Sequence, residues 1–170
     1  TTYTYDAHGN VTTVSDPHGN TRLQTYDELD RPTRTVEAAY TDAVHGRIRP
    51  VTRLTYTLLG WLARLDAGRS DVSGTALATD VVVRQQTSTY DNFGRRLTAT
   101  NALGATWRWT YDPFGNPLTQ TDALEQTTTW EWSYGGQLRR QTDHEGSRTT
   151  YTRNALGQVT RVQHPVVTST

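Results

Sequence analysis

The sequence predicts an all-β fold made of tandem antiparallel β-hairpin repeats of about 21 residues. Two spacings predict it. A Tyr-Asp pair recurs with a 21-residue step, and a glycine four residues after the Tyr keeps the same count. Turn signals also fall every 10 or 11 residues, which is typical of consecutive hairpins. The repeat-signature residues are Tyr5, Asp6, Gly9, Tyr26, Asp27, Tyr90, Asp91, Gly94, Tyr111, Asp112, Gly115, Gly136 and Gly157.

The first strand of each repeat alternates with a period of two residues. Trp107, Trp109 and Tyr111 fall on one face of the expected strand, and Arg108 and Thr110 fall on the other. Aromatic and β-branched residues suit a half-buried pleated surface. The same alternation occurs in Tyr3–Tyr5 and Trp130–Trp132.

A four-residue Asp-x-x-Gly turn follows that strand. The Asp side chain accepts hydrogen bonds from the turn backbone, and the Gly supplies the positive φ that closes the turn. We expect such turns at Asp6–Gly9, Asp91–Gly94 and Asp112–Gly115. Gly115 should therefore have a positive φ, and the periodic register gives the same role to Gly136 and not to Gly135.

A second turn begins 11 residues after the signature aromatic position and returns the chain. We expect about seven repeats in a single segment, residues 1–170, with insertions near 38–51 and 67–83. The chain has no Met and starts within a repeat, so we interpret it as a fragment of a larger protein. No helix of any length is expected, and Leu58–Arg64 is the best candidate for a short one.

The charge balance excludes several partners. Seventeen basic and seventeen acidic residues give a net charge of zero, so nothing draws the chain to nucleic acid or to an anionic membrane. Cysteine is absent, which excludes disulfides and thiolate metal sites. No apolar run approaches the roughly 18 residues of a membrane span.

The histidines do not form a recognisable metal site. His8 and His18 occupy similar Asp-x-His-Gly-Asn turns at opposite ends of one expected strand, about 33 Å apart. His45, His144 and His164 have no partner pattern and are read as solvated loop residues. We predict no catalytic, cofactor-binding or metal-binding residue in the segment.

Two local carboxylate pairs are compatible with a glycosidase, but turn formation explains them better. They are Asp122 with Glu125 and Asp143 with Glu145, and each pair lies in the second turn of its repeat. Arginines nearby are expected to pair with Glu131 and Glu145 across strands. These arginines are Arg108, Arg139, Arg140 and Arg148.

Four Trp residues form the strongest candidate ligand surface. Aromatic rings can stack on the apolar faces of sugars, so Trp107, Trp109, Trp130 and Trp132 are candidate sugar-stacking residues. The alternative, which we favour, is that these rings pack the sheet.

The repeat resembles a known family. The segments Tyr111–Leu118 and Tyr90–Leu97 resemble the YD repeat of Rhs proteins, whose relatives occur in insecticidal toxin complexes and in teneurins. This resemblance implies a spiralling β-sheet that closes as a hollow shell, or cocoon, around a C-terminal toxin domain. A carbohydrate-binding or cell-surface-binding module is the alternative, and an enzyme is a distant third.

The resemblance also implies partners and a location. The partners would be adjacent repeats of the same chain, the enclosed toxin domain, and secretion-apparatus or chaperone proteins. The parent would be a secreted or delivered bacterial effector. Rhs cores often end in a self-cleaving Asp-Pro-x-Gly-Leu motif. Here Asn116 follows Asp112–Gly115 where that motif has Leu, so we read an ordinary turn.

Overall fold

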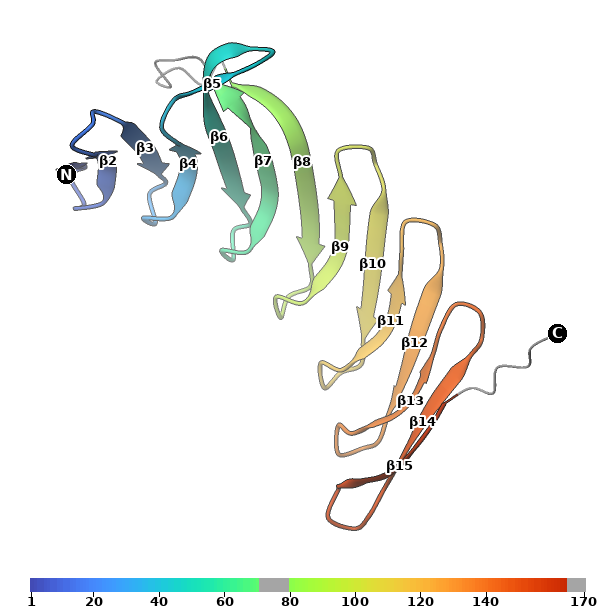
Figure 1. The fold of residues 1–170 in the computed structure, drawn as a ribbon. Helices are drawn as coiled ribbons and strands as arrows, with labels where there is room; N and C mark the ends of the chain where they lie inside the picture. The colour runs from blue at the N-terminus through green and yellow to red at the C-terminus, as the bar shows by residue number, and fades with distance from the viewer. Residues whose placement is uncertain (71–79, 165–170) are drawn as a thin grey trace. The chain divides into compact units, whose positions relative to one another are not determined.

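A computed structural model describes residues 1–70 and 80–164 of the chain. These residues form strands and turns, and no helix occurs among them (Figure 1). The prediction of an all-β fold with antiparallel hairpins is confirmed. The chain divides into two compact units, residues 1–88 and 89–170.

Unit 1 (residues 1–88) is an antiparallel sheet with the strand order β1-β2-β3-β4-β6-β7-β8. The short strand β5 pairs with the start of β6, outside that order. The bounds are β1 (Thr2–Tyr5), β2 (Val11–Ser15), β3 (Thr21–Tyr26), β4 (Pro32–Val36), β5 (Tyr40–Asp42), β6 (Gly46–Tyr56), β7 (Leu62–Ser70) and β8 (Val81–Tyr90).

Unit 2 (residues 89–170) begins at the last two residues of β8 and continues as seven strands in sequence order. Each of these strands pairs antiparallel with the next one. The bounds are β9 (Arg96–Asn101), β10 (Thr106–Tyr111), β11 (Pro117–Thr121), β12 (Thr127–Trp132), β13 (Leu138–Thr142), β14 (Arg148–Arg153) and β15 (Val159–Gln163).

A β-bulge recurs at one position of the repeat. In the first hairpin Thr4 pairs with Thr13 and Tyr5 pairs with Val11, which leaves Thr12 as an extra residue. The same shift precedes the signature position in β3, β6, β10, β12 and β14. Bulges bend a strand and redirect side chains, so these six hairpins share the same local bend.

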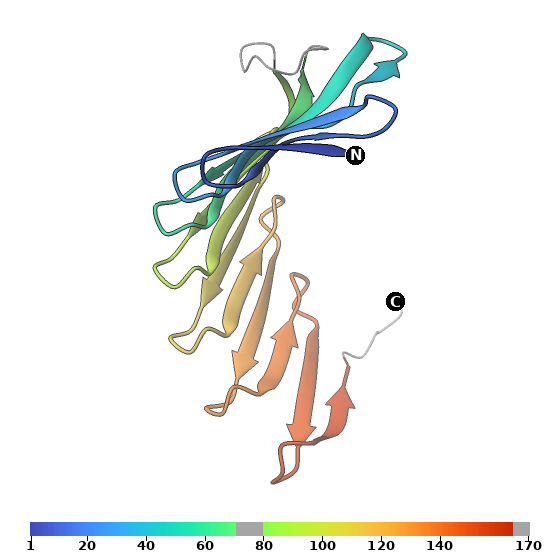
Figure 2. The ribbon, with the colours of Figure 1, turned by 90° about the vertical axis from the view of Figure 1, so that its left-hand side faces the viewer.

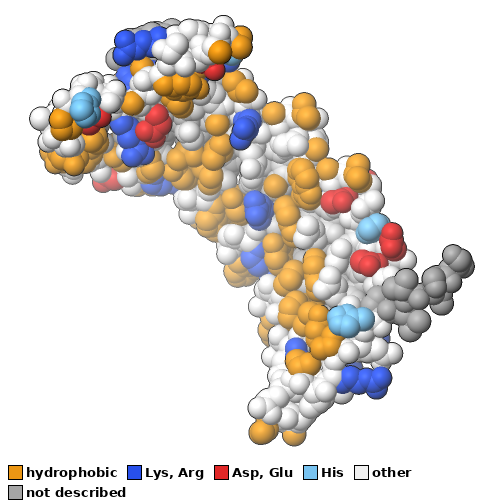
Figure 3. Space-filling view, in the orientation of Figure 1, with side chains coloured by type: hydrophobic (Ala, Val, Ile, Leu, Met, Phe, Trp, Pro, Cys, Tyr) orange, Lys and Arg blue, Asp and Glu red, His pale blue; other side chains and the backbone are white. Residues whose placement is uncertain are grey.

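The sheet is a single layer in each unit. Figures 1 and 2 show no second layer on the described strands, and hydrophobic side chains are spread over the visible surface (Figure 3). The buried hydrophobic residues among those described are Val36, Val51 and Ala99. The predicted alternation is nevertheless present in β10. Arg108 and Thr110 are exposed, and Trp107, Trp109 and Tyr111, which alternate with them, are half-buried.

The suggestion of a short helix at Leu58–Arg64 is wrong. Residues 57–60 form the same tight turn as the other repeats, with the Gly60 N–H donating to the Thr57 carbonyl at 2.9 Å, and β7 begins at Leu62. Leu58 and Leu59 lie at the exposed tip of this turn. Of the predicted insertions, the first contains β5 and the start of β6, and residues 71–79 of the second lie outside the described residues.

Candidate functional site

The signature turn is a closed hydrogen-bonded unit around one carboxylate. Asp112 Oδ1 accepts from the backbone N–H groups of Phe114 (2.9 Å) and Asn116 (2.8 Å). Asp112 Oδ2 accepts from the Asn116 side-chain amide at 2.8 Å, and the Gly115 N–H donates to the Asp112 carbonyl at 3.1 Å. The turns at 6–9, 16–19, 27–30 and 91–94 repeat the backbone contacts.

These contacts favour the ionised carboxylate. The Asn116 side-chain amide, followed by backbone N–H donors, lowers the pKa of Asp112, although partial burial opposes that effect. The Arg31 side chain has the same effect on the pKa of Asp27, and the Asn20 side chain on that of Asp16. Asp16, Asp27 and Asp112 are therefore structural anions that stay charged at neutral pH.

The glycines that close the turns confirm the predicted register. Gly115 has φ +94° and Gly136 has φ +72°, whereas Gly135 does not have a positive φ. Two turns end in a non-glycine residue with positive φ instead, Asp30 and Glu125. Both side chains reach a neighbouring strand or turn, because Asp30 contacts His8 at 2.9 Å and Glu125 accepts from Arg108 at 2.8 Å.

The residue at the signature position links several repeats to the repeat before them. The Tyr26 hydroxyl donates to the carbonyl of Val11 at 2.9 Å, and the Tyr111 hydroxyl donates to the carbonyl of Arg96 at 3.0 Å. In both cases the acceptor lies 15 residues earlier, at the first residue of a strand. We call this hydrogen bond the repeat clamp. Across the first insertion, Tyr56 makes the corresponding bond to Pro32.

The repeat clamp explains two departures from Tyr at the signature position. Trp132 Nε1 donates to the Pro117 carbonyl at 2.7 Å, and Arg153 Nη2 donates to the Leu138 carbonyl at 3.2 Å. Tyr, Trp and Arg each carry a planar group with a hydrogen-bond donor. Sequence reasoning missed this role, although the fixed position of a donor-bearing flat side chain in every repeat was the available signal.

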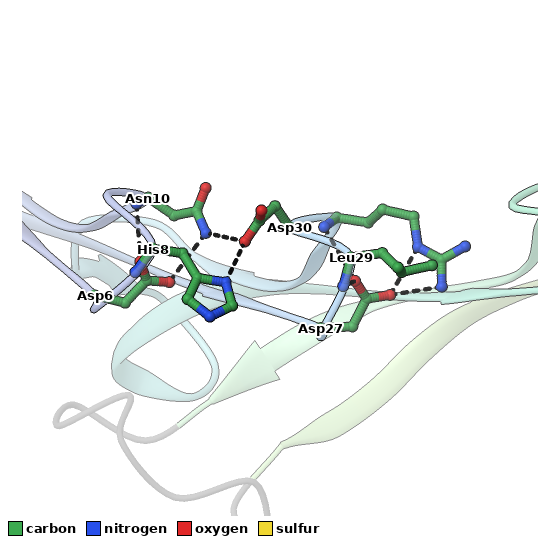
Figure 4. Close-up of polar contacts among 7 residues, drawn as sticks. Asp6, His8, Asn10, Asp27, Leu29 and Asp30 are labelled. Carbon is green, nitrogen blue, oxygen red and sulfur yellow. Dashed lines mark hydrogen bonds and ion pairs between the residues drawn. The ribbon is translucent and has the colours of Figure 1, made fainter.

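Neighbouring turns in unit 1 are also joined through side chains (Figure 4). His8 Nδ1 lies 2.9 Å from Asp30 Oδ1, and the Asn10 amide bridges Asp30 Oδ1 (2.6 Å) and Asp6 Oδ2 (3.1 Å). The hydrogen bond with Asp30, followed by its charge, raises the pKa of His8. Beside this cluster lies an open hollow of about 710 Å³, lined in part by Tyr26.

The structure does not bring the histidines together. His8 lies in the turn before β2 and His18 in the turn after it, at opposite ends of that strand. Among residues 1–70 and 80–164, no group of three or more His, Cys, Asp or Glu side chains could hold a metal ion. In the same residues no helix is long and apolar enough to cross a membrane.

The two carboxylate pairs lie in ordinary second turns. Asp122 Oδ1 accepts from the Leu124 N–H at 2.8 Å, and Asp143 Oδ1 accepts from the Glu145 N–H at 3.1 Å. Glu131 pairs with Arg140 at 2.9 Å, as expected across strands, but Arg108 pairs with Glu125 instead. The acids therefore stabilise turns and strand pairs.

The four Trp rings are half-buried on the strands that the sequence predicted. The Arg96 guanidinium stacks over the Trp109 ring with its carbon 5.0 Å from the ring centre, a cation–π contact. Trp132 is committed to the repeat clamp. Sugar stacking by Trp107, Trp109 and Trp130 stays a hypothesis.

A buried polar cluster in unit 1 was not foreseen. Arg34 is 6% exposed and binds the fully buried carboxylate of Asp80 through Nε (2.8 Å) and Nη2 (2.6 Å). Ser70 also contacts Arg34, at 3.3 Å. Burial alone would raise the pKa of Asp80, but hydrogen bonds from Arg34 and Ser70 and the charge of Arg34 lower it. The ion pair therefore connects Asp80, the residue before β8, to Arg34 of β4.

These features define a class of protein, a tandem array of β-hairpin repeats. The same type of turn and the same type of clamp hydrogen bond recur along it. The family model described as RHS Repeat matches residues 5–42, 90–127 and 132–166. The chain belongs to the RHS repeat family. As a run of these repeats, the segment is a structural element and not a catalytic domain.

One solved structure shows the same fold over most of this chain. The crystal structure of TcdB2-TccC3 without its hypervariable C-terminal region matches 92% of this chain, with 16% identity and a TM-score of 0.50. The crystal structure of TcdB2-TccC3-Cdc42 matches 95% of this chain and 11% of that chain, with 14% identity and a TM-score of 0.36. A structure of a Photorhabdus luminescens Tc holotoxin pore matches 95% of this chain and 12% of that chain, with 14% identity and a TM-score of 0.34. The chain spans 10% of the length of the first structure. No curated protein matches.

Proposed function

We propose that the chain is a wall segment of a hollow β-sheet shell that encloses a C-terminal toxin domain of its parent protein until delivery. Membership of the RHS repeat family supports this function. A single-layer sheet is also suited to a wall, because it separates two spaces without a thick core. In this proposal residues 1–170 contribute about seven repeats to a larger protein, a secreted or delivered effector.

The observation that carries the proposal is a pair of apolar rows at the hairpin tips of unit 2. In a sheet of consecutive hairpins, alternate turns lie at opposite ends of the strands (Figure 1). We call the edge with turns 91–94, 112–115, 133–136 and 154–157 rim A, and the edge with turns 101–104, 122–125 and 143–146 rim B. Rim A exposes Phe93, Phe114, Tyr134 and Leu156, and rim B exposes Leu103 and Leu124.

These side chains are unusually exposed for their type. Their exposed fractions lie between 73% and 94%, and the Phe114 and Tyr134 rings contact each other edge to face with centres 6.0 Å apart. Rows of exposed apolar residues mark interaction surfaces. Tips of one rim recur every second strand, about 9–10 Å apart. A further run of the same repeats has a matching period, so rim A of one winding of the spiralling sheet would cover rim B of the next winding.

Sedimentation velocity tests the wall function. The chain should self-associate in the micromolar range, and a triple variant, Phe93→Ser/Phe114→Ser/Leu156→Ser, should shift toward monomer. Val83→Ser, which removes an exposed apolar residue from a strand of unit 1, is the control and should behave as the unsubstituted 170-residue chain. If the unsubstituted chain is monomeric at all concentrations, the proposal is refuted. In the full-length protein, the triple variant should also expose the C-terminal domain to protease.

The remaining partners belong to the same proposal. The first partners are adjacent repeats of the larger protein, and the second partner is the enclosed C-terminal domain. Secretion-apparatus or chaperone proteins would act on the assembled shell during delivery. Protease protection of the C-terminal domain in the full-length protein separates enclosure from simple tethering.

Carbohydrate binding is the second candidate function. One observation favours it, namely that Trp107, Trp109 and Trp130 keep part of their surface open on one face of unit 2. Titration with mono- and oligosaccharides, followed by Trp fluorescence, should then show a saturable change that Trp109→Ala removes. No change with any sugar would dismiss this candidate.

A further inference from the structure

Unit 2 contains a polar hollow that the turns and clamps do not explain. It has a volume of about 400 Å³ and lies between β12, β13 and β14. Its charged lining residues are Glu131, Arg139, Arg140 and Arg153, and Tyr151 contributes one ring. Three guanidinium groups therefore face one carboxylate, which leaves an excess of positive charge.

The recurrent bulge brings two consecutive arginines to this hollow. Trp132 pairs with Leu138 and Glu131 with Arg140, so Arg139 is the extra residue of the bulge. In the first hairpin the extra bulge residue is Thr12, and its hydroxyl contacts that of Thr4 across the hairpin. In this repeat, Arg139 corresponds to Thr12 and Glu131 corresponds to Thr4. A bulge redirects the extra side chain. Arg139 and Arg140 can therefore line the hollow together, although strand residues normally alternate.

The guanidinium groups of the hollow are incompletely used. Arg140 donates to Glu131 at 2.9 Å, whereas Arg139 has no hydrogen-bond or ion-pair partner among the described residues. Arg153 uses Nη2 in its clamp bond, and its Nε is buried without a partner in the described part of the chain. Arg139 therefore offers an unused guanidinium to an acidic group in the hollow.

We propose that this hollow binds a carboxylate side chain of an acidic polypeptide segment. Guanidinium groups match planar carboxylates through paired hydrogen bonds, and Arg140 already makes such a contact with the Glu131 carboxylate at the wall of the hollow. A sugar acid fits less well, because Tyr151 is the single ring among the lining residues on which it could stack. The inference rests on the proposed function, since an enclosed domain would present such a segment to the wall.

Fluorescence anisotropy with a labelled Glu-rich peptide tests this site, with the same peptide carrying Gln as the neutral control. The 170-residue chain should bind the acidic peptide and not the Gln peptide, and added salt should weaken binding. Arg153→Tyr is the sharpest variant, because it restores the residue found elsewhere in the repeat, keeps a clamp donor and removes the guanidinium. Loss of one charge-assisted bond should weaken binding about tenfold.

Arg161→Gln is the matched control. It removes the same charge from exposed β15, outside the lining of the hollow, and should change affinity less than about twofold. Equal losses for Arg153→Tyr and Arg161→Gln would mean unspecific attraction and would overturn the proposal. So would equal binding of the Gln peptide, or binding of inorganic phosphate or an acidic polysaccharide in place of the peptide. A negative peptide result leaves the sedimentation test of the rims unaffected.

Discussion

The repeat clamp makes a sharp prediction for Tyr111→Phe. This change removes only the hydroxyl that donates to the Arg96 carbonyl at 3.0 Å, and the ring remains. A hydrogen bond of this kind contributes about 0.5–1.5 kcal/mol net, and water can reach part of this site, so we expect a loss of about 1 kcal/mol. Equilibrium urea unfolding, followed by Trp fluorescence, measures that loss.

The controls for this prediction come from the chain itself. Tyr134→Phe removes a hydroxyl that has no hydrogen bond among the described residues and should change the free energy of unfolding by less than about 0.5 kcal/mol. Tyr111→Trp should retain stability better than Tyr111→Leu, because Trp132 makes the clamp with its indole nitrogen. If Tyr111→Phe and Tyr134→Phe have equal effects, the clamp does not stabilise the array.

Three further predictions concern the turns and the buried cluster. Gly115→Val should cost about 1–3 kcal/mol because φ is +94°, whereas Gly135→Val should be milder, and thermal melts compare the two. Asp112 has a lowered pKa when folded, so its contribution should be complete above about pH 4 and be lost as pH falls further. Asp112→Asn should therefore flatten the melting temperature between pH 6 and pH 3, and an unchanged slope would contradict this role. Asp80→Ala should cost about 3–5 kcal/mol in denaturant unfolding, because it leaves the Arg34 charge buried. A loss below about 1 kcal/mol would show that the cluster is not structural.

The hairpins and their turns were predictable because their determinants are local. Asp112 and Gly115 lie within one turn, and the carboxylate and the positive φ act on that turn alone. A 21-residue period then places the next turn. The same period assigned the turn-closing position to Gly136 and not to Gly135, and of the two only Gly136 has a positive φ.

The parts that the sequence did not predict depend on distant residues. Arg34 and Asp80 are 46 positions apart and fall outside the repeat pattern, so their ion pair has no periodic signal. The clamp joins residues of neighbouring strands, and its donor changes from Tyr to Trp132 and Arg153. Leu58–Arg64 was the best candidate for a short helix, but a tight turn between Thr57 and Gly60 and the strand β7 occupy these residues.

Cysteine cross-linking between chains tests the wall function most directly. The sequence contains no Cys, so single variants Phe114→Cys on rim A and Leu124→Cys on rim B give a clean background. Thr110→Cys, on an exposed strand position, is the control. Mixing the two rim variants under mild oxidation should give the mixed disulfide dimer faster than either variant mixed with the control. Equal rates for all mixtures would show that the rims do not meet and would contradict the shell-wall account.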